Sequence, residues 1–317
     1  MSFVPRHAWN HKRMISLAEN DWRERRAKHE ARVRRWIEPR LERAARHERD
    51  PVQDFLFEYY PYRPAKLLRW HAGIGVELQG ETAREYLSCK DYQETQHGVT
   101  VGVFQLTAMR IQSIGWIGNM LRRTADRMGA FGCFGLHEWA MVYEAESIRH
   151  PAWPLRVTTA DIGRVVDSLQ IRCTHYDAFR FFTSPARPLN KYQLTRETTS
   201  AFEQPGCLHT NMDLYKWAFK LAPFTASELV ADCFELATKI RALDMQASPY
   251  DFTALGYFPV KIETPEGRAE YESKQREFAL YAAPLRDRLV TVCDQIIEKV
   301  PGGAVDRESR TTTLSQR

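Results

Sequence analysis

Three short segments of the chain each combine a cysteine, a histidine and a carboxylate. They are Cys133-Phe-Gly-Leu-His137-Glu138, Cys173-Thr-His175-Tyr-Asp177 and Cys207-Leu-His209-Thr-Asn-Met-Asp213. Imidazole and carboxylate groups are ligands for Zn, Fe or Mn, and they are also the usual general acids and bases. One such histidine alone is typical of a core residue that is hydrogen-bonded to the neighbouring carboxylate. Three similar segments favour a shared polar pocket.

A metal site is one interpretation of this pattern. Its ligands would come from five side chains: His137, His175, Asp177, His209 and Asp213. The chain would then be a metal-dependent hydrolase or oxygenase that acts on a small molecule, with Zn, Fe or Mn as its cofactor. The sequence contains neither an HExxH motif nor a CxxC pair, and its cysteines are more typical of small apolar core residues than of ligands. A third interpretation is a helical binding protein in which the polar cluster is structural.

Helical periodicity dominates the chain and predicts a mainly α, single-domain protein with a few short strands and long irregular loops. Helices are expected over 17–38, 104–127, 137–144, 159–170 and 264–299. Pro39 is expected to kink or divide the first of them, because proline lacks a backbone N–H donor.

Two spacings predict that a histidine and a carboxylate share one face of an element. Residues 171–182 alternate in part, and in a strand His175 and Asp177 would point to the same side. A helix is expected after residue 206, and the i,i+4 spacing of His209 and Asp213 would put both side chains on one face of it. Both predictions support a pocket in which these groups meet.

Two further segments supply polar side chains, the irregular stretch 184–206 and the DMQASPYD segment at 244–251. Arg187 and Asn190 are candidates for substrate or phosphate contacts, although hydrogen bonding within a loop is the commoner role of such residues. Asp244 lies either at the edge of a pocket or near the capped end of a helix, and the pattern favours neither position. A long irregular stretch is often functional.

The composition is that of an ordinary globular protein. The 317 residues are 44% apolar and 27% charged, which excludes a disordered or collagen-like chain. No apolar run is long enough to span a membrane, and the beginning of the sequence lacks the apolar core of a signal peptide. We therefore expect a cytoplasmic protein with no membrane partner. The tail over 301–317 is expected to be disordered.

Positive charge is concentrated in the first 50 residues, which hold 14 Lys or Arg and 8 Asp or Glu. The chain is therefore divided into a basic helical segment over 1–50 and a helical catalytic domain over 51–300. The arginines over 23–35 are candidates for a nucleic-acid contact. Glutamates are interleaved with them, which favours a solvated helix face instead.

Four strings of the sequence resemble a bacterial, largely actinobacterial, family of about this length. They are FGCFGLHEWAMVY (131–143), HYDAFRFFT (175–183), EQPGCLHTNMDLYKWAFKL (203–221) and DMQASPYD (244–251). Members of this family are commonly labelled 3-methyladenine DNA glycosylase. The resemblance implies a DNA repair enzyme that hydrolyses the N-glycosidic bond of alkylated purines in double-stranded DNA and needs no cofactor.

Under this resemblance the site residues fall into two chemical classes. A glycosylase needs a carboxylate that activates water or stabilises an oxocarbenium ion, and the candidates are Glu138, Asp177 and Asp213. It also needs an aromatic platform for a flipped, cationic base. The aromatic candidates are Trp139, Tyr176 and Trp217. Core packing is the alternative role of these three rings.

Overall fold

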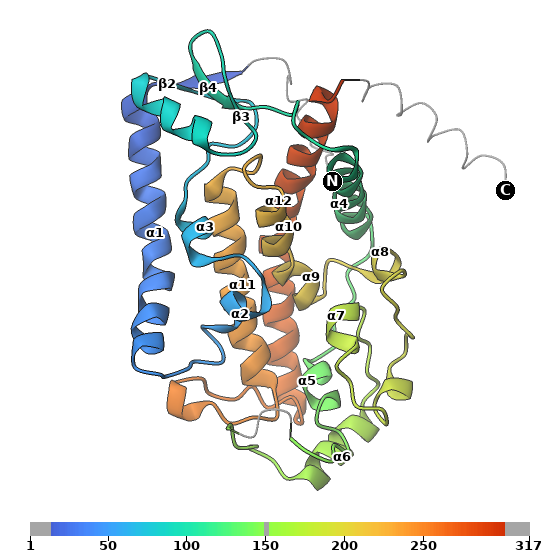
Figure 1. The fold of residues 1–317 in the computed structure, drawn as a ribbon. Coiled ribbons are helices and arrows are strands. Elements are labelled where there is room, and N and C mark those ends of the chain that lie inside the picture. The colour runs from blue at the N-terminus through green and yellow to red at the C-terminus, as the bar shows by residue number, and fades with distance from the viewer. Residues whose placement is uncertain (1–13, 149–151, 302–317) are drawn as a thin grey trace, which may run out of the picture.

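The computed structural model describes residues 14–148 and 152–301, so parts of the predicted basic segment and of the predicted tail lie outside the described residues. Helices make up 56% of the structure, which confirms the predicted mainly α class. Figure 1 shows the described α-helices. They are α1 (Glu19–Ala45), α2 (Phe55–Tyr59), α3 (Pro64–Leu68), α4 (Ala108–Ala125), α5 (Leu136–Ala140), α6 (Thr159–Ser168), α7 (Tyr176–Phe179), α8 (Thr199–Phe202), α9 (Leu208–Met212), α10 (Leu214–Lys220), α11 (Ser227–Ala247) and α12 (Pro265–Lys299).

A small sheet covers one end of the helices (Figure 1). It consists of β1 (Ile15–Leu17), β2 (Val76–Gln79), β3 (Tyr92–Glu94) and β4 (Gly98–Val101) in the order β1-β2-β4-β3. Strand β1 is parallel to β2, with Ser16 opposite Glu77, and the other pairs are antiparallel. Three short 3-10 helices, η1 (Glu81–Ser88), η2 (Arg187–Leu189) and η3 (Thr253–Leu255), lie in the connections of the described chain.

Helix α11 lies at the centre of the helical packing and contacts α1, α3, α9, α10 and α12. Two thirds of its residues are buried, and they occur on all sides of the helix. A helix that is apolar on most of its surface is typically enclosed by other elements. The sequence therefore makes α11 the helix on which the neighbouring elements are positioned.

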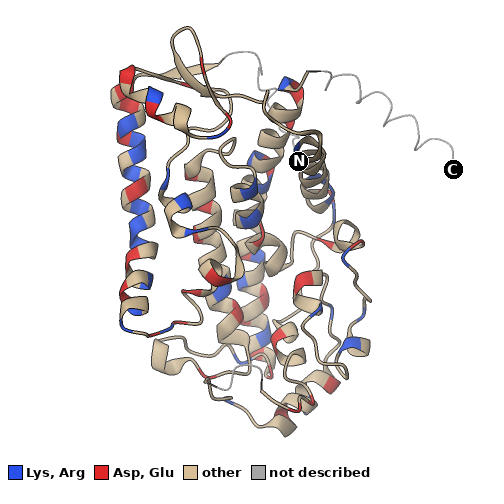
Figure 2. Ribbon diagram, in the orientation of Figure 1, with Lys and Arg blue, Asp and Glu red and all other residues tan. Residues whose placement is uncertain are grey.

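The arginines of α1 hold this helix against α11 through ion pairs. Arg32 lies 2.7 Å from Asp232 and 2.6 Å from Glu235, and Arg25 lies 2.9 Å from Glu228. Figure 2 shows that basic and acidic residues also alternate along the rest of α1. These contacts support the interpretation of the arginine-rich segment as a charged, packed helix face.

Of the two expected effects of Pro39, a kink or a division of the first helix, the division does not occur, because α1 continues through Pro39 and is 27 residues long. Proline removes a single backbone donor from the helix, and contacts beyond it hold the second half in place. The guanidinium of Arg40 lies 5.2 Å from the ring centroid of Phe57, and Arg43 forms an ion pair with Asp54 at 2.6 Å. Tertiary contacts thus outweigh the local cost of the proline.

Several other predicted elements are present with changed lengths. The helices expected over 104–127, 159–170 and 264–299 correspond to α4, α6 and α12. The helix expected over 137–144 is the shorter α5. Among the described helices, none combines the length and the apolar composition that a membrane span requires.

Residues 171–182 do not form the predicted strand. Ile171 makes an isolated bridge with Asn190, and α7 begins directly after His175, whose carbonyl accepts the N–H of Phe179. The rings of Phe179 and Phe182 contact each other with centroids 5.2 Å apart. Aromatic residues three apart meet on a helical turn, so the aromatic content of this segment stabilises a turn rather than a strand.

Candidate metal centre

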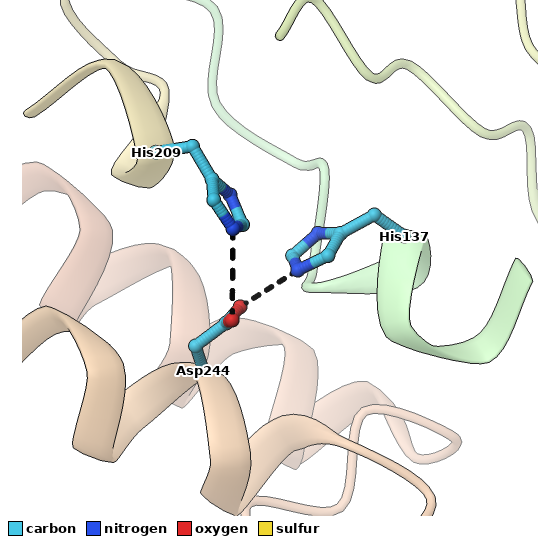
Figure 3. Close-up of side chains that lie close together, drawn as sticks. All are labelled: His137, His209 and Asp244. Carbon is cyan, nitrogen blue, oxygen red and sulfur yellow. Dashed lines mark ion pairs between the residues drawn. The ribbon is translucent and has the colours of Figure 1, made fainter. Parts of the chain in front are cut away.

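Two histidines and an aspartate from three different helices converge (Figure 3). His137 lies on α5, His209 on α9 and Asp244 on α11. Nε2 of His137 is 3.0 Å from Oδ1 of Asp244, and Nε2 of His209 is 3.8 Å from Oδ2 of the same carboxylate. One ligand atom of each residue lies within 4.8 Å of the other two. These three side chains are called the triad below.

Two facing atoms of the triad are buried without a hydrogen bond. His137 Nε2 and Asp244 Oδ1 are 3.0 Å apart, close enough for an ion pair when the ring is protonated, but neither atom has a well-aligned hydrogen bond to any described residue. Such buried polar atoms are rare, because each costs about 1–3 kcal/mol. Two ligands of one metal ion are held at roughly this separation with their lone pairs directed at the ion, since metal–nitrogen distances are about 2.1 Å. The arrangement is therefore typical of a metal site.

A left-handed glycine before α5 positions His137. Gly135 has a φ of 67°, and a Cβ on it would lie 3.3 Å from Cβ of Ala247, so α5 approaches the end of α11 closely. The indole Nε1 of Trp139 donates to the carbonyl of Ala247 at 2.9 Å and fastens the two helices together. His137 therefore faces Asp244, which lies one turn earlier on α11.

Charges within the triad determine its protonation states. Burial disfavours the charged form of His137, but the carboxylate of Asp244 outweighs burial and raises the pKa of His137. Burial, together with the charge on His137, lowers the pKa of His209 to about 3. Burial alone would raise the pKa of Asp244, but the two histidines and Arg241 hold this pKa well below its usual range. An ionised Asp244 and a neutral His209 are the forms that bind metal ions.

Glu138 and Arg241 border the triad. Oε1 of Glu138 is 3.7 Å from Nε2 of His137, and Nη1 of Arg241 is 3.5 Å from both Glu138 and Asp244. Two carboxylates and one guanidinium lie beside the imidazole rings, and the raised pKa of His137 favours a charged ring as the second cation when no metal ion is bound. A metal ion would replace the proton on that ring, because a histidine that binds metal is neutral.

The triad is built from three helices that no linear motif connects. No family model, no curated protein and no solved structure matches the chain. The resemblance to the glycosylase family therefore stays an expectation.

A second polar cluster adjoins the triad. It contains His175, Asp177 and Asp213, whose ligand atoms also lie within 4.8 Å of one another. The rings of His175 and His209 stack with centroids 5.3 Å apart and so connect the two groups. The chain supplies its own cation here, because Lys216 forms ion pairs with Asp213 and, at 3.6 Å, with Asp177. This second group is called the lysine cluster.

Glu203 and Tyr60 complete the hydrogen bonding of the lysine cluster. Nδ1 of His175 and Oε1 of Glu203 share a hydrogen bond of 2.8 Å, and the Tyr60 hydroxyl donates to Oδ1 of Asp213 at 2.7 Å. Burial opposes charge on Asp213, but Lys216 outweighs burial and lowers the pKa of Asp213. Burial opposes charge on Lys216 as well, and Asp213 in turn raises the pKa of Lys216. The cluster therefore contains a charged, internally neutralised ion pair, which makes it a poorer metal site than the triad.

The structure divides the five predicted metal ligands between these two groups. His137 and His209 belong to the triad, and the other three belong to the lysine cluster. His209 and Asp213 lie one helical turn apart, as their i,i+4 spacing predicts, because the N–H of Asp213 donates to the carbonyl of His209 at 2.8 Å, but their side chains belong to different groups. The carboxylate beside His209 is instead Asp244, which lies within α11 and not in a loop.

The three cysteines of the sequence segments also adjoin the triad. Cys133, Cys173 and Cys207 line a small cavity of about 20 Å³ together with His137 and His209. Burial raises the pKa of Cys207 to about 12 and raises the pKa of the other two thiols as well. Thiols that stay protonated are poor ligands, and neither of the two ligand groups found among the described residues includes a cysteine.

Two larger cavities border the two groups. The apolar cavity has a volume of about 470 Å³, and both His209 and Glu138 line it. Its apolar lining includes Phe55, Tyr59, Met141, Phe181, Met245 and Phe252. The polar cavity has a volume of about 580 Å³, and His175 and Asp213 line it. Asp177 lines both cavities.

The remaining predicted site residues occupy different surroundings. Trp139 is fully buried in the core, whereas Tyr176 and Trp217 line the polar cavity. Arg187 is exposed, and its guanidinium donates to a backbone carbonyl. Asn190 is buried, and its side chain bonds to backbone groups of the neighbouring segment. The contacts of Asn190 support its interpretation as a loop-stabilising residue.

Proposed function

We propose that the chain is a metal-dependent enzyme, a hydrolase or an oxygenase, that acts on a small apolar molecule at the triad. The observation that carries the proposal is the 3.0 Å approach of His137 Nε2 to Asp244 Oδ1 without a hydrogen bond. The neutral ring of His209 adds a second imidazole to this buried site. Two imidazoles and one carboxylate form the ligand set of many zinc hydrolases and of non-haem iron oxygenases.

Residues beside the triad suit either reaction. A bound Zn, Fe or Mn ion would supply Lewis acidity and, for iron, oxygen chemistry. Glu138 borders both the triad and the apolar cavity, so its carboxylate can accept a proton from a water or a substrate there. Arg241 holds Glu138 in this position through a 3.5 Å contact. The identity of the bound metal decides between the two reaction classes.

The apolar cavity supports a small apolar substrate. Its volume of about 470 Å³ falls within the range of about 300–1,000 Å³ that small-molecule sites occupy. Rings such as those of Phe55 and Phe181 would stabilise a bound ligand by burying apolar surface against it. His209 and Glu138 contribute polar groups to the same cavity, which would bring an apolar substrate next to the triad.

Elemental analysis of the protein tests this function. Protein produced in medium supplemented with Zn, Fe and Mn is expected to retain close to one equivalent of one of these metals. Asp244→Asn and His209→Ala should lose it, because each removes a ligand. Asp213→Asn is the matched control, since it changes a buried aspartate outside the triad. Metal-free wild-type protein, or metal loss in Asp213→Asn but not in Asp244→Asn, would contradict the proposal.

The glycosylase activity implied by the resemblance stays a prediction. Its candidates Glu138 and Asp213 are buried, whereas Asp177 is partly exposed. Most of the arginines of α1 that would contact phosphates are engaged in ion pairs, such as that of Arg32 with Asp232. Incubation with methylated duplex DNA tests the prediction. Release of 3-methyladenine that is lost in Asp177→Asn or Asp213→Asn would support it, and no release would contradict it.

We also infer that the protein works in a reducing compartment such as the cytoplasm. All six cysteines are free thiols, as is usual in that compartment. Thiol titration of protein purified without reductant is expected to count six thiols, and a disulfide would contradict the inference.

A further inference from the structure

The polar cavity, bordered by α4, α7, α8 and α10, has a charged lining that the metal hypothesis does not use. Its cationic side chains are Arg180, Arg196, Lys216 and Lys220. Its carboxylates are Asp177, Glu203 and Asp213. The balance of these charges indicates what the cavity can bind.

The carboxylates of the cavity already have partners within the chain. Asp213 pairs with Lys216, and Asp177 pairs with Arg180 at 3.2 Å. The third carboxylate, Glu203, bonds to the ring of His175 and raises the pKa of that imidazole against the effect of burial, so the charged ring balances it. These contacts balance two of the four cations and leave two over.

Arg196 and Lys220 are the two cations that remain. Neither forms an ion pair with any residue that the structure describes, and both side chains are exposed at the cavity. The ammonium of Lys220 lies 5.4 Å from the ring centroid of Trp217. Burial, and after it the charge of Lys216, lowers the pKa of Lys220, although Asp213 and Asp177 act in the opposite direction.

Trp116 adds a flat apolar wall to the same cavity. This residue is 45% exposed, and its ring meets the ring of Trp217 at a centroid distance of 5.7 Å and an angle of 63°. A partly exposed indole can bury more apolar surface when a planar group packs against it. The wall and the two cations thus lie in one cavity.

We propose that the polar cavity binds a small organic anion, in which a carboxylate or phosphate group sits on a flat apolar body. Arg196 and Lys220 hold the anionic group through charge-assisted hydrogen bonds, and Trp116 packs against the body. The volume of about 580 Å³ accommodates a ligand of this kind. This site is separate from the triad, and its ligand binds whether or not the triad holds a metal ion.

Calorimetric titration of the full chain tests the proposal, with benzoate, phenyl phosphate, acetate and inorganic phosphate as probes. We expect saturable binding of benzoate or phenyl phosphate that weakens as salt is added, and the tighter of the two identifies the anionic group. Lys220→Met and Arg196→Gln should each weaken binding about tenfold, because each removes a hydrogen bond between charged groups. Trp116→Ala should abolish the preference for the aromatic probes over acetate and inorganic phosphate.

Arg123→Gln is the matched control, because this exposed arginine of α4 is not among the residues that line the cavity. It should bind the probes as the wild type does, and melting temperatures verify that all variants are folded. Wild-type affinity in both Lys220→Met and Arg196→Gln, or no saturable binding at millimolar probe, would overturn the proposal. Titration with and without added metal separates the two hypotheses, since a triad that holds no metal contradicts only the metal-dependent function.

Discussion

Replacing Lys216 by methionine tests whether a buried ion pair holds the lysine cluster together. The side chains of Asp213 and Lys216 are only 5% and 16% exposed, so both charges are largely removed from water. Loss of the ammonium leaves the Asp213 carboxylate with the Tyr60 hydroxyl at 2.7 Å and the more distant ring of His175 at 3.8 Å. Removing one partner of a buried pair costs about 3–5 kcal/mol, because the other charge stays buried without compensation. Lys216→Met should lower the free energy of unfolding by about this amount.

Urea unfolding and thermal melting measure this loss. In a protein of this size about 1 kcal/mol corresponds to about 2–4 °C, so the melting temperature should fall by about 6–20 °C. The double variant Lys216→Met/Asp213→Asn removes both charges and should recover most of the stability, because no uncompensated charge remains. A single variant as stable as the wild type, or a double variant less stable than Lys216→Met, would refute the reasoning.

Three further predictions concern sites away from both clusters. Burial lowers the pKa of His71 to about 4, whereas an unfolded histidine titrates near 6.5. As the pH falls from about 6.5 to 4 the unfolded state takes up this proton first, so stability should fall by about 3 kcal/mol. Urea unfolding across this pH range should show a smaller loss in His71→Gln, and an unchanged loss would argue against it. A Cβ on Gly206 would lie 2.5 Å from the carbonyl oxygen of Ala130. Because the backbone must shift to relieve this contact, Gly206→Ala should lower the free energy of unfolding by about 1–3 kcal/mol. An unaltered melting temperature would be inconsistent with this contact. Arg156 donates to both oxygens of Glu263, at 2.6 and 2.9 Å, so Arg156→Met should lower the free energy of unfolding by about 2 kcal/mol, and urea unfolding with no change would show that the pair adds nothing.

The elements that sequence reasoning predicted well are those whose helical pattern is long. The sequence predicts α4 and α12 because their apolar residues recur with helical spacing, and these helices are 18 and 35 residues long. The expected start of the last helix near residue 264 is also correct, since the Thr264 side chain accepts the N–H of Gly267 and caps α12. Local signals of this kind act within a few residues, and the tertiary contacts of these two helices agree with them.

Short and interrupted segments were predicted less well, because contacts with distant residues decide them. Helix α1 passes Pro39 since ion pairs such as Arg43–Asp54 hold its second half. The carboxylate of Asp213 is bound by Tyr60, 153 residues earlier in the sequence, and not by the histidine one turn before it. Neither partner can be identified from local spacing.

The candidate site shows the same division between local and distant information. The repeated occurrence of a histidine beside a carboxylate predicted that His137 and His209 meet in one site, and the structure brings them together. The same pattern predicted Asp213 as a carboxylate of that site, whereas the structure places Asp244 there. Both aspartates have a cation three residues away in the sequence, Lys216 after Asp213 and Arg241 before Asp244. Lys216 forms a close ion pair with Asp213, whereas the guanidinium of Arg241 is 3.5 Å from Asp244 and is shared with a second carboxylate. The feature that distinguishes the proposed metal site from an internal ion pair is therefore how completely the nearby cation neutralises its aspartate, and only the packing of α9, α10 and α11 determines that.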